Sequence, residues 1–324
     1  MELFAELTVA DYQQSLRGIF GERLQENVSL ARYTSARVGG PADYLLVVES
    51  SSVLEAATRN LWDLGISFLI LGGGSNVLVS DAGVRGVVLI NRARKMRFEA
   101  QSKTPSVWAE SGANFGMLAR QAANRGLAGL EWACGIPGTL GGAVIGNAGA
   151  HGGDMAGSLL VAEILHRDES NQYHHEQWTV DRLEYSYRSS NLKRQDKDAV
   201  ILSARLKLEP GTKEAVLSKM ESFIEQRRKT QPPGASMGSM FKNPLGDYSG
   251  RLIEAAGLKG YRTGGAEISA LHANFFINLG EATAMDIYRL LQVARARVAE
   301  QFGVNLELEI ELVGDWYLAE AEAL

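Results

Sequence analysis

The chain has 324 residues, of which 45% are hydrophobic and 22% are charged, and its formal net charge is -5. These values are typical of a globular protein with two domains, and the acidic balance argues against nucleic-acid binding, which depends largely on clustered Lys and Arg. The single cysteine, Cys134, rules out an intrachain disulfide. No apolar run approaches the roughly 20 residues that span a bilayer, and the start, MELFAELTVADYQQ, lacks the features of a secretory signal. We therefore expect a cytoplasmic protein.

The first two thirds of the chain have a pattern of mixed α and β structure. Ser51 and Ser52 precede an amphipathic helix that ends at Gly65, and a second helix runs from Asn114 to Gly126. In both, a polar residue marks the start and a glycine marks the end. Short apolar runs between turn residues predict strands at 66–71, 76–79, 86–90, 106–110, 161–166, 173–178 and 199–208.

A break at Glu209-Pro210-Gly211 separates this part from the rest of the chain. Periodicity after the break predicts a helix at 213–229, and then a helix, a strand, a helix and a strand at 249–258, 272–279, 283–302 and 306–312. This unit of about 100 residues is large enough for a core of its own. The expected organisation is an α+β protein with an N-terminal helical segment (1–30), a first domain (31–210) and a second domain (211–324).

Glycine is the unusual feature of the composition, since 11 of the 35 glycines fall between Gly126 and Gly157. Regular helices and strands are not expected there, because each glycine costs them about 0.5–1 kcal/mol. The segment GIPGTLGGAVIGNAGAHGGDM (135–155) therefore predicts bare backbone along a ligand, and LGGGSNVLVSD (71–81) predicts an anion-binding nest. A planar cofactor with a diphosphate would explain both segments. The alternatives are a tight turn and a loop packed against a strand.

The loop GASMGSMFKNP (234–244) contains Ser236 and Ser239 without the pattern of a nucleophilic serine. The G-x-S-x-G motif is absent because Met-Phe follows Ser239, and the five histidines show no metal-ligand spacing. We expect neither a metal site nor a Ser-His-Asp site. Cys134 has no nearby histidine in the sequence before His151, which favours a buried structural thiol.

Two further patterns contain charged residues. YSYRSS (185–190) places Arg188 among hydroxyl groups, and the strand period of LELEIEL (306–312) puts Glu307, Glu309 and Glu311 on one face. An edge strand with a solvated acidic face is the alternative for the second pattern. The run Arg227-Arg228-Lys229 fits a helix C-terminus, where cations complement the helix dipole.

Together, these segments resemble the UDP-N-acetylenolpyruvoylglucosamine reductase family, the flavoenzymes of peptidoglycan precursor synthesis. The matching segments cover nearly the whole chain in the family's order: YTSARVGGPADY, LGGGSNVLVSD, GIPGTLGGAVIGNAGAHGGDM, YRSS, GSMFKNP, SGRLIEAAGLKG, HANFFIN and LELEIELVG. The resemblance implies an FAD-binding domain of the vanillyl-alcohol-oxidase (PCMH) type, followed by a smaller α/β substrate-binding domain whose tail returns to the first. The direct passage from YRSSNLKRQDKD into AVILSARLKL resembles the family's shorter, type II form.

The resemblance also implies the ligands. FAD would be bound noncovalently, NADPH would be a co-substrate, and UDP-N-acetylglucosamine enolpyruvate would be the substrate, without a nucleic acid, a membrane or an obligate protein partner. The implied cofactor-binding residues all belong to the two glycine-rich segments: Gly72, Gly73, Gly74, Ser75, Asn76, Ile136, Pro137, Gly138, Thr139, Gly141, Gly142, Asn147 and Gly149.

The resemblance implies three catalytic residues, Arg188, Ser239 and Glu309. Hydride would pass from NADPH to FAD and then to the terminal enolpyruvyl carbon. Ser239 would supply the proton, while Arg188 and Glu309 would support the enol-like intermediate. Glu309 is preferred to Glu307 because it precedes the apolar residue that matches the family's Val, although Leu308 stands where the family usually has Pro. The implied substrate-binding residues are Tyr187, Lys229, Lys242 and Asn243.

Two other functions stay open at this point. Another PCMH-type flavin oxidoreductase, such as an oxidase acting on an alcohol, would have its flavin reduced by its substrate instead of by NADPH. A nucleotide-sugar-binding module without redox activity would be colourless when purified.

Overall fold

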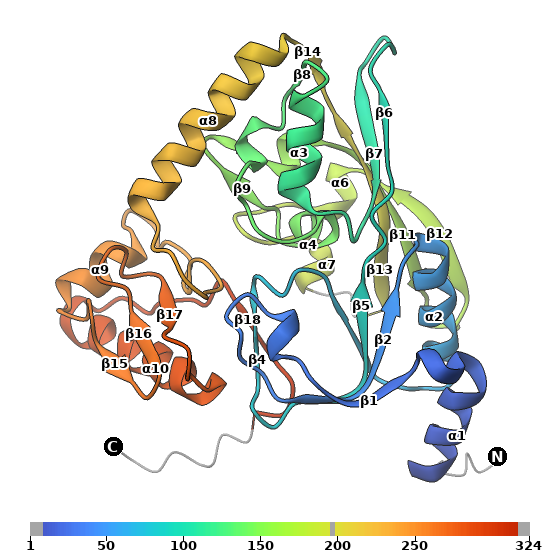
Figure 1. Ribbon diagram of the computed structural model, residues 1–324, viewed down its shortest axis with the longest axis horizontal. Helices are drawn as coiled ribbons and strands as arrows, with labels where there is room; N and C mark the ends of the chain where they lie inside the picture. The colour runs from blue at the N-terminus through green and yellow to red at the C-terminus, as the bar shows by residue number, and fades with distance from the viewer. Residues whose placement is uncertain (1–8, 195–197, 317–324) are drawn as a thin grey trace.

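Two β-sheets organise the first two thirds of the chain in the computed structural model, which describes residues 9–194 and 198–316 (Figure 1). The first sheet has the strand order β1-β2-β5-β3, and only its β1–β2 pair is antiparallel. The second has the order β12-β11-β13-β7-β6 and is antiparallel throughout. The bounds are β1 Gln25–Ser29, β2 Pro41–Val48, β3 Phe68–Leu71, β5 Val84–Asn91, β6 Met96–Glu99, β7 Ser106–Glu110, β11 Leu159–Arg167, β12 Tyr173–Trp178 and β13 Ala199–Lys207.

Helix α2 (Ser51–Asp63) joins the two sheets, because its apolar side chains share one core cluster with residues of both. Ser50 caps this helix by accepting a hydrogen bond from Val53 N, one residue before the predicted cap. Helix α1 (Val9–Phe20) contributes Leu16 and Phe20 to the same cluster. Residues 1–8 of the expected N-terminal segment lie outside the described residues.

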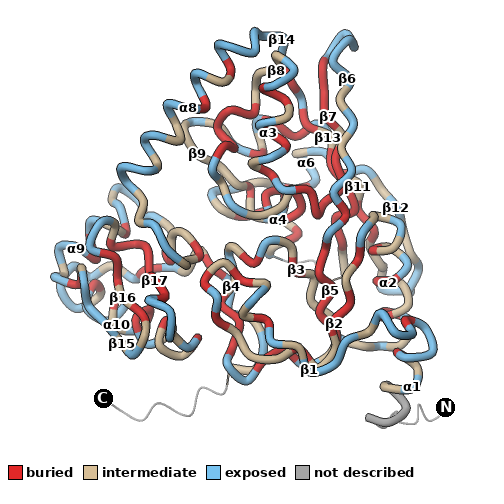
Figure 2. The backbone as a smooth tube through the Cα atoms, viewed as in Figure 1, coloured by how far each residue is buried: buried red, intermediate tan, exposed pale blue. Residues whose placement is uncertain are grey.

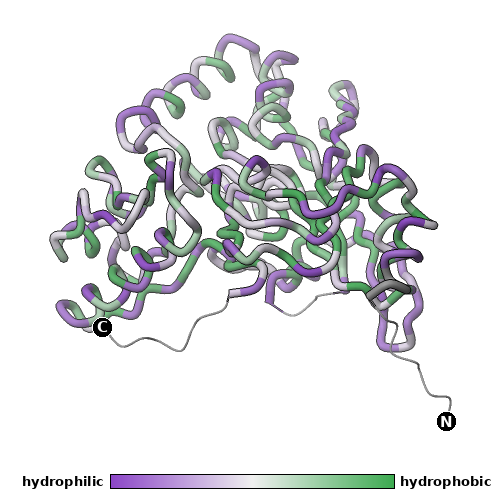
Figure 3. The backbone as a smooth tube through the Cα atoms, turned by 60° about the horizontal axis from the view of Figure 1, so that its bottom comes forward, coloured by the Kyte–Doolittle hydropathy of each residue, from purple (hydrophilic) through white to green (hydrophobic). Residues whose placement is uncertain are grey.

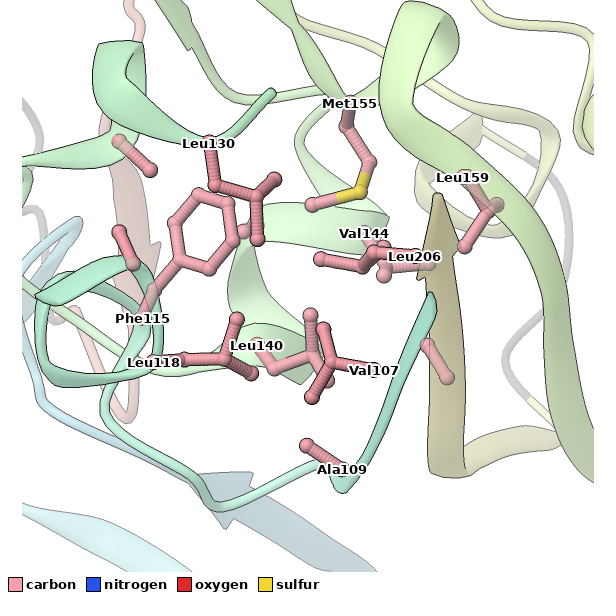
Figure 4. Close-up of a cluster of buried hydrophobic side chains, with 14 of the residues drawn as sticks. Val107, Ala109, Phe115, Leu118, Leu130, Leu140, Val144, Met155, Leu159 and Leu206 are labelled. Carbon is pink, nitrogen blue, oxygen red and sulfur yellow. The ribbon is translucent and has the colours of Figure 1, made fainter. Parts of the chain in front are cut away.

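A second core lies between the antiparallel sheet and the glycine-dense segment. Helix α3 (Phe115–Ala123), capped by Asn114 as predicted, and helix α4 (Leu140–Ile145) pack their apolar residues against β7 and β13 (Figure 4). The expectation that regular helix would avoid the glycine-dense segment was therefore wrong for α4. Burial of Leu140 and Val144 in this core stabilises a helix that two glycines weaken.

Short elements complete this part of the chain. They are the 3₁₀ turns Gly21–Arg23, Ala31–Tyr33 and Glu131–Ala133, β8 Leu127–Ala128 with β14 Glu209–Pro210, β9 Gly149–Ala150 with β10 Gly153–Asp154, α5 Met155–Ser158, α6 Val180–Leu183 and α7 Asn191–Arg194.

Helix α8 (Lys213–Thr230) runs along the outside of the molecule toward a third unit (Figure 1). Its residues are largely exposed, apart from Val216 and Met220 (Figure 2). Hydrophobic residues concentrate on the interior strands, whereas the outer helices carry many hydrophilic ones (Figure 3). Among the described residues, no helix combines the length and apolar character that crossing a membrane requires.

The third unit combines helix α9 (Ser249–Ala255), the three-stranded antiparallel sheet β15 (Arg262–Thr263), β16 (Ala266–Ile268) and β17 (Phe276–Asn278), and helix α10 (Ala284–Phe302). Asp81 accepts hydrogen bonds from the first-turn amides of α10, at 2.9 Å from both Ala284 N and Met285 N. Strand β18 (Glu311–Val313) then leaves this unit and pairs in parallel with β4 (Val77–Val79). Residues 311–313 thus pair with the strand that follows the first glycine-rich turn.

Candidate active site

A cavity of about 520 Å³ lies where the three parts of the chain meet. This volume is within the roughly 300–1,000 Å³ of small-molecule sites. Its wall includes Arg188, Ser239 and Glu309, together with every predicted cofactor-binding residue except Asn147. Segments that are far apart in the sequence therefore converge on one space.

The two glycine-rich segments pack directly against each other along this wall. A Cβ atom on Gly73 would lie 2.9 Å from Gly138 Cα, and Ser75 Oγ donates a hydrogen bond to Pro137 O at 3.3 Å. A Cβ atom on Gly138 would lie 2.7 Å from Ser75 Oγ, and Gly138 has φ +110°. The glycines at this contact are needed because one loop packs closely against the other loop instead of against a strand, and both loops still line the cavity.

Gly142, in the middle of α4, is different because it opens toward the cavity. Within 4 Å, its Cβ atom would meet only Thr139 Oγ1, at 3.8 Å, and Gly142 is exposed at the cavity wall. The N–H group of its neighbour Gly141 is held by Ser111 O at 2.8 Å. A rigid, bare backbone surface of this kind fits a planar group lying against the helix.

Arg188 is held at the tip of a tight turn. Ser186 and Ser189 exchange backbone hydrogen bonds of 3.0 and 3.2 Å, and Arg188 adopts the left-handed φ of +56°. Ser190 Oγ donates to Ile145 O at 2.7 Å, and Asn147 Nδ2 donates to Ser186 O at 3.0 Å. Asn147 was predicted to bind the cofactor. It does not line the cavity and instead fastens the Arg188 turn to the end of α4.

Arg188 and Glu309 form an ion pair, with Nε 2.9 Å from Oε1. The pair is not an aligned hydrogen bond, since Arg188 Nε is buried and has no hydrogen-bond partner among the described residues. The charge of Arg188 is thus balanced by Glu309, while the Nε N–H group itself has no acceptor among the described residues. Burial raises the pKa of Glu309, while the positive charges of Arg188, Lys193 and Lys242 act in the opposite direction.

The three glutamates of LELEIEL do not share one face, because the segment is not one continuous strand. The backbone bends at Glu309 and Ile310, and only Glu311 to Val313 pair as β18. Glu307 pairs with Lys242, whereas Glu311 pairs with Lys193 at 3.1 Å. Side-chain exposure is 72% for Glu307 and 16% for Glu309.

Tertiary hydrogen bonds cause the bend. Glu309 N donates to Met240 O at 2.9 Å, and Asn76 Nδ2 donates to Glu309 O at 3.1 Å. Asn76 O also accepts from Glu311 N at 2.9 Å. Asn76 and Met240 thus hold the Glu309 backbone from opposite sides, which strand periodicity alone does not predict.

Ser239 lies in an extended bridge with Phe275 at the cavity wall. It is partly buried, and its hydroxyl group makes no hydrogen bond to another residue in the described part of the chain. Ser236, in the same loop, does not line the cavity.

The four residues predicted to bind the substrate lie outside the cavity wall. Tyr187 is 55% exposed, next to Arg188. Lys229 is exposed near the end of α8, and Lys242 pairs with Glu307. Asn243 Oδ1 accepts a hydrogen bond from Ser249 N at 3.1 Å, at the start of α9. Their contact with a substrate stays a prediction.

Sequence reasoning missed several polar residues of the wall, of which Lys193, Arg227 and His151 matter most. Lys193 follows the YRSS motif, so its position could have been noticed, whereas Arg227 was interpreted as part of a helix terminus. The His151 ring stacks on Phe223 with centroids 4.1 Å apart, and its buried Nε2 has no partner among the described residues. Burial lowers the pKa of His151, and the Arg227 charge acts in the same direction.

The chain is similar to known proteins along nearly its whole length. An FAD binding domain matches residues 42–165, and the C-terminal domain of UDP-N-acetylenolpyruvoylglucosamine reductase matches residues 229–313. The reductase of Chloroflexus aggregans is 42% identical over 295 residues, which cover 90% of this chain and 97% of that protein. The Bacillus subtilis reductase is 38% identical over 289 residues, which cover 89% and 93% of the two chains.

A solved structure is also similar. The crystal structure of UDP-N-acetylenolpyruvylglucosamine reductase from Thermus caldophilus superposes with a TM-score of 0.74 at 36% identity, and the match covers 90% of this chain and 99% of that one. The predicted α+β class, with an FAD-binding domain followed by a smaller domain, is confirmed by these matches and by the observed elements.

Proposed function

The chain belongs to the UDP-N-acetylenolpyruvoylglucosamine reductase family of FAD-binding oxidoreductases, and we propose that it reduces UDP-N-acetylglucosamine enolpyruvate to UDP-N-acetylmuramate with NADPH as the reductant. The observation that carries this proposal is the convergence of Arg188, Ser239 and Glu309 with both glycine-rich loops on one cavity.

The two glycine-rich segments would hold FAD noncovalently. Gly142 offers an open, bare helix surface for a planar ring, and the backbone of Gly72 to Asn76 and Ile136 to Thr139 offers close approach to a diphosphate. His151 Nε2, buried and unpartnered at the same wall, offers one hydrogen bond to a polar group of a ligand. When bound, FAD supplies the hydride chemistry that the reaction requires.

Ser239 would protonate the carbon that bears the substrate carboxylate. An alcohol is a weak acid, but a carbanion-like centre is a far stronger base, so the proton transfer is favourable when the hydroxyl group is well placed. Ser239 suits this role because it lines the cavity and its hydroxyl group has no hydrogen-bond partner among the described residues.

Arg188 would stabilise the negative charge that develops on the enolpyruvyl group, and Glu309 would support this role by positioning Arg188. Arg188 has a buried N–H group that no described residue accepts, and Lys193 adds a second positive charge at the wall. Glu309 holds Arg188 in place through the 2.9 Å ion pair. Preorganised charges of this kind act most strongly where a site excludes water.

The two domains would divide the ligands between them. Residues 31–210 would bind the flavin and residues 211–324 the sugar nucleotide, with Lys242 and Asn243 near its diphosphate and Tyr187 and Lys229 at the rim.

The colour of the purified protein and two changes in that colour test the proposal. The purified protein should be yellow, should bleach with NADPH, and should regain its colour under anaerobic conditions when UDP-N-acetylglucosamine enolpyruvate is added. Bleaching by an alcohol in place of NADPH would indicate an oxidase instead, and a colourless protein that cannot take up FAD would contradict the proposal.

A further inference from the structure

Asn274 forms an unusual contact with the segment that carries Ser239. Its side chain is 3% exposed and makes two hydrogen bonds to one residue: Oδ1 accepts from Phe241 N at 3.0 Å, and Nδ2 donates to Phe241 O at 2.8 Å. Its backbone carbonyl accepts from Met240 N at 2.9 Å. Asn274 does not line the cavity and has no role in the site described above.

The segment needs this contact because its backbone is irregular. Met240 and Phe241 are consecutive, yet both are buried in the same core, with exposures of 0% and 1%. A regular strand would alternate their directions. The chain instead bends at Met240, whose N–H group faces Asn274 and whose carbonyl faces Glu309 N.

The Asn274 amide occupies the place of a neighbouring strand at this bend. The buried N–H and C=O groups of Phe241 both depend on it, since they cannot reach water and buried backbone groups are almost always paired. The bend leaves Ser239, one residue earlier, at the cavity wall. The position of Ser239 therefore depends on the Asn274 side chain.

We propose that Asn274 is a positioning residue, which fixes the Ser239 hydroxyl by clamping the backbone of Phe241. This inference rests on the proposed function, in which Ser239 protonates the substrate. It predicts that a change confined to the Asn274 amide slows the step that uses Ser239 and leaves flavin binding unchanged.

Asn274→Asp is the sharpest variant, because its carboxylate can still accept from Phe241 N but cannot donate to Phe241 O. Asn278→Asp is the matched control. Asn278 is also buried, its Nδ2 donates to Ala36 O at 2.9 Å, and its Oδ1 accepts from Gly280 N and Ala282 N. These contacts lead away from Ser239.

The variants are compared as flavin-loaded proteins reduced with dithionite, so that the result does not depend on NADPH. Reoxidation by UDP-N-acetylglucosamine enolpyruvate should slow by about 10²-fold in Asn274→Asp, the usual effect of a catalytic group misplaced by about 1 Å. Asn278→Asp should stay within about threefold of the wild type. If the wild-type protein itself is not reoxidised, the proposed function fails and the inference fails with it.

A double-mutant cycle separates positioning from general damage. If Asn274 acts through Ser239, adding Asn274→Asp to Ser239→Ala should slow reoxidation little further. If the double variant slows reoxidation by the product of the two single-variant factors, the inference is overturned. A readout besides activity is the NMR chemical shift of the Phe241 carbonyl carbon, which should move in Asn274→Asp, where this carbonyl loses its donor, and stay unchanged in Asn278→Asp.

Should Asn274→Asp not yield folded protein, the same cycle applies to Asn274→Ser, whose smaller side chain leaves room for a bridging water. If neither Asn274 variant folds while Asn278→Asp does, Asn274 is a structural residue and the positioning role is refuted.

Discussion

Replacing Gly142 with leucine should separate cofactor binding from folding. In the flavin-free protein, a Cβ atom at this position meets only Thr139 Oγ1, at 3.8 Å, so the helix can accept a side chain. Removing a glycine from the helix interior should stabilise the apoprotein by about 0.5–1 kcal/mol. The apoprotein melting temperature should then rise by about 1–4 °C.

FAD binding should weaken in the same variant, because the leucine side chain would occupy the cavity wall against which the flavin is proposed to lie. Forcing extra carbon atoms into a filled site costs about 1–3 kcal/mol. The dissociation constant of FAD should therefore rise by about 5- to 150-fold. Flavin content of the purified protein and FAD titration of the apoprotein measure this change.

Gly138→Leu is the informative comparison. Its side chain would start 2.7 Å from Ser75 Oγ at a residue with φ +110°, so the apoprotein itself should lose stability. Flavin loss in that variant would report on loop packing, whereas flavin loss in a stabilised Gly142→Leu protein reports on the cofactor. If Gly142→Leu retains full flavin at wild-type affinity, α4 is not the wall that contacts FAD.

Four further predictions concern the catalytic residues and the joint between the two domains. Ser239→Ala should bind FAD and bleach with NADPH normally but be reoxidised by the substrate about 10²–10⁴-fold more slowly. Ser236→Ala is the control and should have a mild effect. Equal slowing of both half-reactions in stopped-flow absorbance would contradict the role of Ser239 as the proton donor. Glu309→Gln should slow substrate reduction by about 10²–10³-fold, as is usual for a lost electrostatic partner, and Glu307→Gln should not; the reverse result in steady-state assays would exclude Glu309. Because burial raises the pKa of Glu309 above its ordinary 4.5, the folded state binds this proton more tightly than the unfolded state, and the resulting stability is lost as pH rises through the folded pKa. In chemical denaturation of the apoprotein, Glu309→Gln should therefore gain stability relative to the wild type as pH rises above 4.5, and a pH-independent difference would refute the burial argument. Asp81→Ala should lower the free energy of unfolding by about 1–2 kcal/mol in urea titrations, because two first-turn amides of α10 lose their acceptor; unchanged stability would mean that this contact is dispensable.

The sequence alone determined the features that depend on local chemistry. Asn114 caps its helix because its side chain reaches Met117 N, three residues away. The two glycine-rich segments and the YRSS and GSMFKNP motifs identified the family, which the comparisons confirm. Motif residues could be named because the chemistry at each position constrains the side chain directly.

Tertiary structure decided which charged residues meet. Strand periodicity treated Glu307, Glu309 and Glu311 alike, but Asn76 and Met240 bend the segment and bury only Glu309 beside Arg188. Strand periodicity does not encode that choice, and only the resemblance to the family favoured Glu309 over Glu307.

The glycines and Asn274 also show which features the sequence determined and which only the tertiary structure decided. Composition predicted that bare backbone was needed, but only the packed loops reveal that Gly138 faces Ser75 whereas Gly142 faces the cavity. The contact of Asn274 with Phe241 joins residues 33 positions apart. Polar groups so distant in sequence pair with each other only when folding buries both of them, because a buried polar group can no longer form a hydrogen bond with water.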